Sequence, residues 1–389
     1  MSKRLEYKWI VAIVSTFGLF MELLDATVVN VAIPTLQRDF HTSTTTIEWV
    51  ITGYLLSLAV FIPVSGWAGD RFGTKRTFIF AMITFTTSSL LCALSWNIGS
   101  LIAFRVLQGV GGGMLTPVGT AMLFRAFPPH ERSKASGVMV IPTTVAPASG
   151  PILGGFLIDY VSWEWIFLVN VPVGLLGILV SARYLREHTE PEPGRLDIPG
   201  FILAASGMAS LLYCLAEAGP RGFDDPRVIV FGVVGLVLLT IFTLVELRVP
   251  EPMIDVRLFK DRLFRWCNSA QFAAMTGFAA TIFLLPIMLQ TEMHYSPFES
   301  GLLTFPTAIG VMCMAQPVSH IYRFIGPRRL IAAGVLIAAI SAFSFATIDN
   351  STPVWLIVLL MFVRGLGFGL MLVPLQAATF ATIPNAMTG

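Results

Sequence analysis

Charged residues are scarce in this sequence. Only 12% of its 389 residues are Asp, Glu, Lys or Arg, whereas 55% are hydrophobic, and the mean hydropathy is +0.77. A soluble domain exposes more polar surface than this composition supplies. The composition therefore excludes an ordinary soluble protein and predicts an all-α polytopic membrane protein that contacts the lipid bilayer.

Cysteine is also rare, and its pattern excludes several kinds of site. Cys92, Cys214, Cys267 and Cys313 stand alone in apolar segments, with no CxxC pair and no Cys/His spacing. Neither a metal site nor a disulfide framework is predicted. No nucleophile–base constellation occurs and the loop charges are scattered, so we expect neither an enzyme nor a nucleic-acid-binding protein.

Apolar segments recur along the whole chain. A membrane-spanning helix needs about 20 apolar residues. Twelve segments qualify: 9–33, 47–69, 77–96, 99–123, 135–158, 165–183, 197–216, 227–247, 264–290, 298–320, 328–347 and 354–376. With the N-terminus in the cytoplasm, 20 of the 25 Lys and Arg residues lie in inside segments, and only Arg38, Arg221 and Arg227 lie in outside loops. The positive-inside rule therefore predicts a multi-pass protein of the cell inner membrane with a cytoplasmic N-terminus.

Two landmarks repeat at nearly the same offset. An Arg-Phe-(x)-Gly pattern with two following basic residues places Gly73 and Gly326 253 residues apart, and two glycine-rich helices place Pro117 and Pro374 257 residues apart. Parallel halves of six helices are a known plan of transporters. Because the offset corresponds to eight spans, two helices are inserted, and 197–216 and 227–247 are the natural candidates.

The repeat predicts three regions. Residues 1–184 form an N-terminal six-helix bundle, residues 185–262 a linker with two inserted transmembrane helices and a cytoplasmic loop, and residues 263–389 a C-terminal bundle with four of its six helices. We expect a truncated chain of a fourteen-span protein, with 12 of about 14 spans present. A natural twelve-span protein with an irregular second half is the alternative.

Two opposite charges are predicted at one depth of the membrane. At 1.5 Å per residue, Asp25 lies about 8 Å and Arg105 about 7 Å below the outer edge of a ~30 Å core. Pairing would offset the cost of burying each charge. Glu22 lies one helical turn below Asp25 on nearly the same face.

Burial opposes ionisation of a carboxyl group, a second acid opposes it further, and a guanidinium favours it. A carboxyl group balanced in this way can gain and lose a proton as a cavity alternates between the two sides, which suits proton coupling. The structural alternatives are a helix-packing ion pair for Asp25 and Arg105 and a protonated packing group for Glu22. Asn30 and Gln108 are further cavity candidates because they lie near this pair, and Arg364 is one because it stands alone in the last span.

Five motifs, in order and on the matching spans, carry a family resemblance. They are Leu24–Pro34 (LDATVVNVAIP), Gly66–Arg76 (GWAGDRFGTKR), Leu101–Gly113 (LIAFRVLQGVGGG), Gly150–Gly155 (GPILGG) and Trp163–Gly174 (WEWIFLVNVPVG). The sequence resembles the major facilitator superfamily, and specifically its fourteen-helix drug:proton antiporter branch of the multidrug efflux type. The resemblance implies two pseudo-symmetric helical bundles with two extra helices. Glu164, where the family commonly has a basic residue, departs from it, and Arg364 aligns with Leu107 rather than with Arg105.

The resemblance gives two motifs a mechanical role. It implies a cytoplasmic gate formed by Gly66, Asp70, Arg71, Gly73 and Arg76, in which glycines permit close helix approach and a tight turn. The alternative is simple anchoring by positive charge. Gly150, Pro151, Gly154 and Gly155 match the antiporter motif, which we interpret as a helix bend and packing seam that binds nothing by itself.

The predicted function is secondary active transport. We expect the export of amphipathic or cationic small molecules, such as drugs, in exchange for protons by alternating access, with no cofactor because the proton gradient supplies the energy. The expected partners are the substrate and protons, and the expected form is a monomer, alone or with a periplasmic adaptor. The alternatives are a dedicated exporter of one metabolite or antibiotic and a non-transporting truncated fragment.

Overall fold

The computed structural model describes residues 6–128, 131–190, 197–249, 256–349 and 352–379, and every regular element in these ranges is a helix. A backbone in hydrocarbon must satisfy its own N–H and C=O groups, which favours helices over irregular chain. The predicted all-α membrane fold is confirmed.

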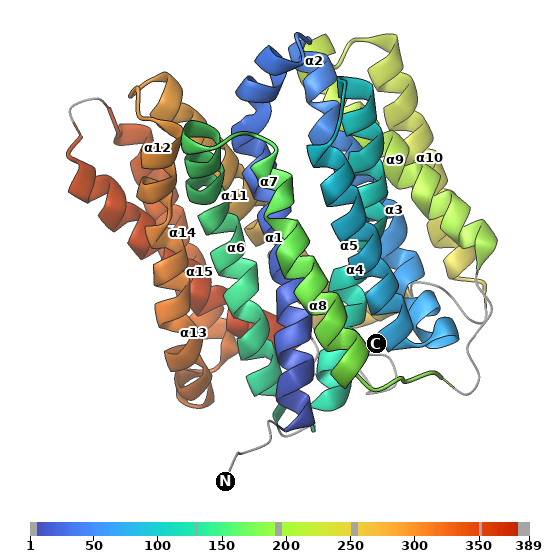
Figure 1. Ribbon diagram of the computed structural model, residues 1–389. Coiled ribbons are helices and arrows are strands. Elements are labelled where there is room, and N and C mark those ends of the chain that lie inside the picture. Colours follow the sequence, from blue (N-terminus) through green and yellow to red (C-terminus); the bar gives the residue numbers. More distant parts are fainter. Residues whose placement is uncertain (1–5, 129–130, 191–196, 250–255, 350–351, 380–389) are drawn as a thin grey trace. The chain divides into compact units, whose positions relative to one another are not determined.

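The helices follow the twelve predicted segments (Figure 1). They are α1 (Tyr7–Asp39), α2 (Thr44–Ile47), α3 (Trp49–Phe72), α4 (Thr74–Ala93), α5 (Ile98–Ala126), α6 (Arg132–Tyr160), α7 (Trp165–Leu168), α8 (Asn170–Tyr184), α9 (Ile198–Arg221), α10 (Pro226–Glu246), α11 (Arg262–Thr291), α12 (Pro297–Thr304), α13 (Pro306–Ile325), α14 (Pro327–Ser344) and α15 (Val354–Thr379), with short 3-10 helices at Val256–Lys260 and Phe345–Thr347. Among the described residues, ten helices, α7 and α8 being counted as one, are long and apolar enough to cross a membrane. The two other predicted spans are α6 and the α12–α13 pair, which includes the shorter apolar helix Phe298–Met314.

Polar side chains fix the starts of several helices. Asp197, Asp225 and Asp261 each accept a hydrogen bond from a backbone N–H in the first turn of α9, α10 and α11. Ser296 forms a reciprocal capping box with Glu299 at the start of α12. These caps satisfy N–H groups that have no partner within the helix.

The predicted internal repeat recurs in the backbone. Gly73 joins α3 to α4 with φ 97°, and Gly326 joins α13 to α14 with φ 79°. Both values lie in the left-handed region that favours glycine. The two turns therefore use the same residue type in the same conformation, as the repeated pattern predicts.

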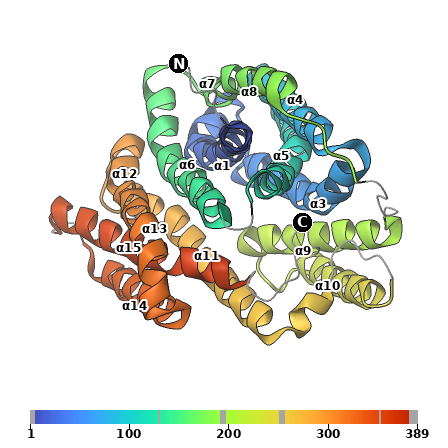
Figure 2. The same ribbon diagram turned by 90° about the horizontal axis from the view of Figure 1, so that it is seen from below.

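The two glycine-rich helices pack in the same way within their own units. In α5, a Cβ on Gly109 would lie 2.5 Å from the Tyr54 carbonyl oxygen of α3, and one on Gly111 would lie 2.6 Å from the Ala81 carbonyl oxygen of α4. Helix α15 likewise packs on α13 and α14, and a Cβ on Gly369 would lie 2.8 Å from the Val311 carbonyl oxygen. Figure 2 shows α5 beside α3 and α4, and α15 beside α13 and α14. Glycine at these positions brings the helix backbones into contact.

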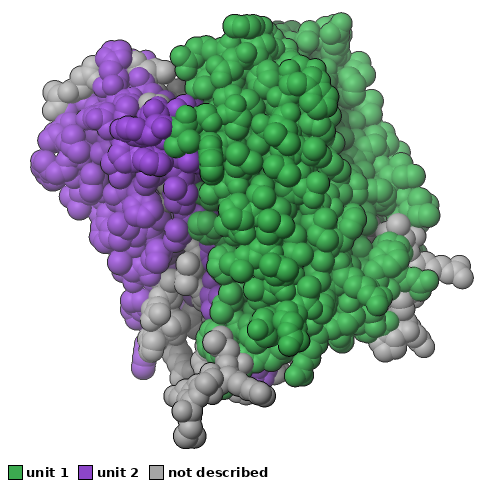
Figure 3. All heavy atoms as spheres, viewed as in Figure 1, with its two compact units in different colours: residues 1–25, 32–126, 161–257 green, residues 26–31, 127–160, 258–389 purple. Residues whose placement is uncertain are grey.

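The chain forms two compact units, coloured in Figure 3. Unit 1 comprises residues 1–25, 32–126 and 161–257, and unit 2 comprises residues 26–31, 127–160 and 258–389. These boundaries differ from the predicted domains in two places. The inserted helices α9 and α10 belong to unit 1, where Trp49 of α3 contacts Tyr213 of α9 at a ring-centroid distance of 5.7 Å.

Helix α6 belongs to unit 2, although the sequence predicts it in the N-terminal six-helix bundle. A Cβ on Gly301 of α12 would lie 2.8 Å from the Ile152 nitrogen of α6, so these two helices are in backbone contact. Packing between helices that are distant in sequence therefore decides the units. The division into bundles at 1–184, 185–262 and 263–389 stays a prediction.

Candidate functional site

Asp25 of α1 lies at the centre of a buried polar cluster in unit 1. Its Oδ2 accepts a hydrogen bond from Arg105 Nη1 of α5 over 2.5 Å. Its Oδ1 accepts hydrogen bonds from Gln108 Nε2 over 2.9 Å and from Asn170 Nδ2 over 3.0 Å. The side chains of Asp25 and Arg105 are both 0% exposed. The ion pair expected from equal depth is therefore present.

Arg105 is held by more than its charge partner. Its Nε donates to the Val50 carbonyl oxygen of α3 over 3.1 Å, and its Nη1 also donates to Gln108 Oε1 over 2.6 Å. The guanidinium carbon lies 4.1 Å from the centre of the Tyr54 ring. A buried ion pair offsets its desolvation only when the remaining hydrogen-bonding groups also find partners. Nε and Nη1 of Arg105 do so, whereas its buried Nη2 has no hydrogen-bond partner among the described residues.

Asn170 and Ser89 complete the cluster, and we did not predict either residue. Ser89 Oγ of α4 accepts hydrogen bonds from Gln108 Nε2 over 2.6 Å and from Asn170 Nδ2 over 3.4 Å. Asn170 stands five residues inside the predicted segment 165–183, about 7 Å deep at 1.5 Å per residue. The depth calculation that paired Asp25 with Arg105 would have found Asn170 too. Ser89 gives no such signal, because serine is common in apolar helices.

Glu22 lies one turn before Asp25 and also faces α5. It is 7% exposed, and its Oε2 accepts a hydrogen bond from the Thr116 hydroxyl group. Two acids of α1 are therefore buried against the same helix, but Glu22 has a neutral partner in place of a guanidinium. This arrangement gives α1 two chemically different carboxyl groups.

Asn30 does not join the cluster. Its Nδ2 donates to the Ala26 carbonyl oxygen of the same helix over 3.3 Å, and the side chain is half-buried. An intrahelical bond of this kind satisfies the amide without any contact to another helix. Of the two predicted cavity residues, Gln108 bonds to Asp25 and Asn30 bonds within its own helix, and the cavity role of both stays a prediction.

Arg364 lies apart from this cluster, in unit 2. It is 2% exposed, and its Nη2 donates to the Gly277 carbonyl oxygen of α11 over 3.1 Å. The guanidinium carbon lies 5.8 Å and 5.1 Å from the ring centres of Phe278 and Phe368. No ion pair of Arg364 occurs among the described residues.

Asp70 of the predicted gate motif lies close to Arg125 at the end of α5. Arg125 Nη2, at the end of α5, lies 3.3 Å from Asp70 Oδ1 and 2.9 Å from Glu190 Oε1. His188 Nε2 lies 3.3 Å from the same Glu190 oxygen. Asp70, Arg125, Glu190 and His188 therefore form a chain of polar side chains.

The segment after α8 runs against the turn between α3 and α4. Thr74 N donates to the His188 carbonyl oxygen over 3.0 Å, and Glu190 N donates to the Asp70 carbonyl oxygen over 3.2 Å. Glu187 accepts from Lys75 N over 3.0 Å and lies 3.6 Å from Arg76 Nε. We call residues 185–190 the clasp, because they hold the turn through both backbone and charge.

The glycines of this motif have different surroundings. The tight turn favours glycine at Gly73 because its φ is 97°, and a Cβ there would displace the end of the Glu187 side chain. Gly66 is exposed, and a Cβ added to it would meet no described atom within 4 Å. The prediction that Gly66 permits close helix approach therefore stays a prediction, since no described residue makes such an approach. Arg71 is exposed as well.

The predicted antiporter motif is a packing seam in unit 2. A Cβ on Gly150 would collide with Thr27 of α1, and one on Gly154 would lie 3.1 Å from the Val28 carbonyl oxygen. Pro151 and Gly155 are buried, and α6 continues through Pro151 without a break. On its other side this stretch contacts Gly301 of α12. The motif therefore packs α1 and α12 against α6.

The sequence matches a family model described as Major Facilitator Superfamily over residues 15–389. The chain belongs to the major facilitator superfamily. It is 35% identical over 381 residues to a putative multidrug resistance protein MdtD of Pectobacterium carotovorum, covering 97% of this chain and 80% of that relative. It is 36% identical over 368 residues to a multidrug resistance protein B homolog of Mycobacterium tuberculosis, covering 93% and 68%.

Solved structures of the superfamily share the fold. The chain aligns with the peptide transporter POT at a TM-score of 0.68 with 17% identity, covering 98% of this chain and 84% of that chain. It aligns with the Escherichia coli xylose transporter XylE at a TM-score of 0.64 with 13% identity, covering 96% and 87%. As a major facilitator the protein is a multi-pass membrane transporter and not an enzyme.

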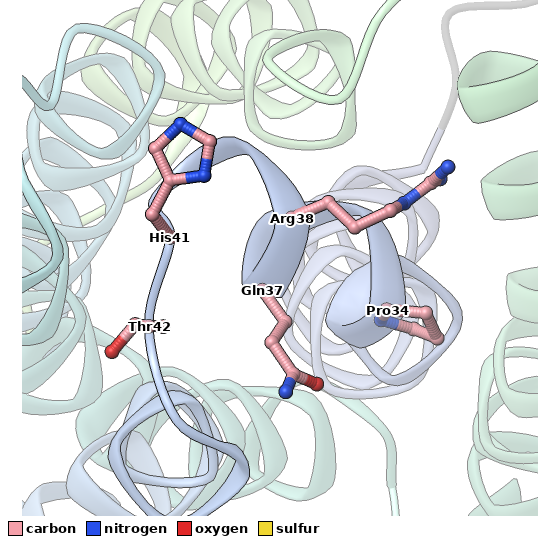
Figure 4. A pocket seen from close by; sticks show the side chains of 5 residues that line it. All are labelled: Pro34, Gln37, Arg38, His41 and Thr42. Atoms are coloured by element: carbon pink, nitrogen blue, oxygen red, sulfur yellow. The ribbon is translucent and has the colours of Figure 1, made fainter.

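A pocket of about 630 Å³ opens at the far end of α1 in unit 1. It is lined by Pro34, Gln37, Arg38, His41 and Thr42, which come from the last two turns of α1 and the residues after it (Figure 4). None of the predicted site residues lines it. Among the described residues, no group of three or more His, Cys, Asp or Glu side chains is arranged to hold a metal ion.

Proposed function

We propose that this major facilitator exports amphipathic small molecules across the inner membrane in exchange for protons, by alternating access. The observation that carries the proposal is the cluster around Asp25. Here a buried carboxylate, bonded to one guanidinium and two amides, links α1, α5 and α8.

The chemistry of this cluster supports proton coupling. An ionised carboxylate only accepts hydrogen bonds, and all three described partners of Asp25 donate N–H groups. A protonated Asp25 would carry an O–H donor that faces other donors, and it would no longer offset the charge of Arg105. Protonation therefore requires the side chains to rearrange, which gives a proton the means to change helix packing.

Glu22 supplies the second acid of the proposed cycle. It lies beside Asp25 on α1 and has a hydroxyl group as its described hydrogen-bond partner. A carboxyl group without a fixed cation can attract a cationic substrate. Proton and substrate would then compete within one helical turn, as exchange requires.

The positions of the basic residues favour a cytoplasmic N-terminus. Arg186 N, after α8, donates to the Tyr7 hydroxyl at the start of α1 over 3.1 Å, and the clasp joins the turn between α3 and α4. The helix ends with the excess of Lys and Arg in unit 1 therefore lie at one end of that unit. The positive-inside rule assigns such an end to the cytoplasm.

The substrate class is supported by the relatives. Two of the proteins that the chain resembles over more than nine-tenths of its length are named for multidrug resistance. We therefore infer amphipathic drugs, including cations, as substrates.

Transport in proteoliposomes tests the proposal. An imposed pH gradient should drive rhodamine 123 across the membrane with the wild-type protein, and Asp25→Asn should abolish this movement while the protein still inserts. Asn30→Ala, which removes only an intrahelical bond, is the matched control and should transport normally. Gradient-driven transport by Asp25→Asn at the wild-type rate would exclude Asp25 as the coupling site. A panel of unrelated dyes separates multidrug export from export of one compound.

A further inference from the structure

Arg364 is a buried cation of unit 2, and four helices of that unit, its own α15 included, carry no acid. No Asp or Glu occurs in α11, α13, α14 or α15. The described hydrogen bond of Arg364 goes to a neutral acceptor, the Gly277 carbonyl oxygen, and its other close neighbours are the Phe278 and Phe368 rings. Charged side chains inside a membrane are costly, and they pair or mark a path for a charged ligand.

Arg105 and Arg364 occupy similar places in the two halves of the repeat but have different acceptors. Each arginine lies in a glycine-rich helix and contacts the first helix of its half of the repeat, α1 for Arg105 and α11 for Arg364. On α1 the acceptor is the carboxylate of Asp25, whereas on α11 it is a main-chain carbonyl. One half of the molecule therefore contains its own counter-ion, and the described part of the other half does not.

The acceptor of Arg364 belongs to an exposed face of small residues. Thr276, Gly277 and Ala280 of α11 are exposed, and a Cβ added to Gly277 would meet no described atom within 4 Å. The guanidinium is thus bonded to a residue that faces open space. A ligand on this face would lie next to the group that holds Arg364.

We propose that Arg364 is an anion subsite, at which the carboxylate or sulfonate of an amphipathic substrate replaces the Gly277 carbonyl as acceptor. A hydrogen bond to an ionised group is roughly twice as strong as one between neutral groups, so the exchange is favourable. Phe278, which is half-buried beside the guanidinium, provides an apolar contact for the body of the molecule. This inference rests on the proposed export function and extends its substrate class to amphipathic anions and zwitterions.

Two dyes with the same three-ring body test the subsite. Fluorescein is an anion and rhodamine 123 is a cation, and fluorescence anisotropy measures the Kd of each for the purified chain in lipid nanodiscs. We expect Arg364→Gln to weaken fluorescein binding about 10- to 100-fold, the range for a lost charge-assisted hydrogen bond. Rhodamine 123 binding should stay within about twofold of wild type, since it does not use the guanidinium. Arg364→Lys should be intermediate, because it keeps the charge without the planar donor group.

Arg329→Gln is the matched control, because it removes one exposed positive charge from the same unit. The proposal is overturned if wild type fails to bind fluorescein, if Arg364→Gln weakens both dyes equally, or if Arg329→Gln has the same effect. It also fails if neither Arg364 variant yields monodisperse protein, since Arg364 is then a packing residue. Binding needs no gradient, so a loss of gradient-driven rhodamine 123 transport would count against the export function and not against the subsite.

Discussion

The side chains around Asp25 determine how protonation of its carboxyl group would affect helix packing. Asp25 of α1 accepts hydrogen bonds from Arg105 and Gln108 of α5 and from Asn170 of α8. The charge of Asp25 therefore helps to hold these three helices together. Buried polar networks of this kind specify one arrangement when every member is satisfied, and they rearrange when one member changes. The amides of Gln108 and Asn170 are therefore as much part of the proposed switch as the ion pair.

The Asn170→Ala variant tests whether Asn170 acts through its hydrogen bond to Asp25 or only through helix packing. It removes one donor to Asp25, which should destabilise the protein by about 1.5–3 kcal/mol, the range for a hydrogen bond to a charged group. We expect a lower thermal unfolding temperature in detergent and slower proton-driven transport. Asn30→Ala is the control, because Asn30 bonds only within its own helix in the described structure. Equal effects of the two variants would show that Asn170 has no special role.

At the level of helices, glycine determines how closely the elements pack, but only at some positions. Gly109 lies against the backbone of α3, whereas Gly66 lies next to open space. Both stand in motifs that the family resemblance highlights. The sequence alone does not separate them, because the difference depends on which neighbouring helix faces each residue.

Gly109→Ala should therefore destabilise the protein by about 1–3 kcal/mol, the usual effect of overpacking, because its Cβ would lie 2.5 Å from the Tyr54 carbonyl oxygen. Gly66→Ala should be neutral or stabilising by up to about 1 kcal/mol, because alanine favours the helix. Thermal unfolding of the two variants beside wild type measures both effects. Destabilisation by Gly66→Ala would show that another helix approaches Gly66 closely, as the motif predicts.

Residues 185–190, the clasp, are held against the turn between α3 and α4 by backbone hydrogen bonds and by ion pairs. Exposed ion pairs contribute only about 0–1 kcal/mol each, so the paired backbone hydrogen bonds of Thr74 and Glu190 should hold most of its position. Glu187→Gln combined with Glu190→Gln should loosen residues 185–190 without unfolding the bundle. Limited proteolysis should then cut this segment several times faster, with Glu292→Gln, an exposed acid of unit 2, as the control. An unchanged rate of cleavage would mean that the charges do not hold the clasp.

For the whole molecule, periodicity and charge in the sequence predicted the helices, the repeat and the Asp25–Arg105 pair. Those features depend on local hydropathy and on distance along a helix, which a sequence contains. The grouping of α6 with unit 2 and of α9 and α10 with unit 1 depends on contacts between distant helices, as at Gly301 and Trp49. Ser89 was missed for the same reason, since its role comes only from the two amides that approach it.

Substrate-induced proton release is the most direct test of the central claim. Purified protein in weakly buffered detergent, with a pH indicator, should release protons when rhodamine 123 is added, because substrate and proton compete for the carboxyl groups of α1. Asp25→Asn should bind the dye but release fewer protons, because only Glu22 remains to compete with it, and Asn30→Ala should behave as wild type. Proton release by Asp25→Asn equal to that of the wild-type protein would contradict the account.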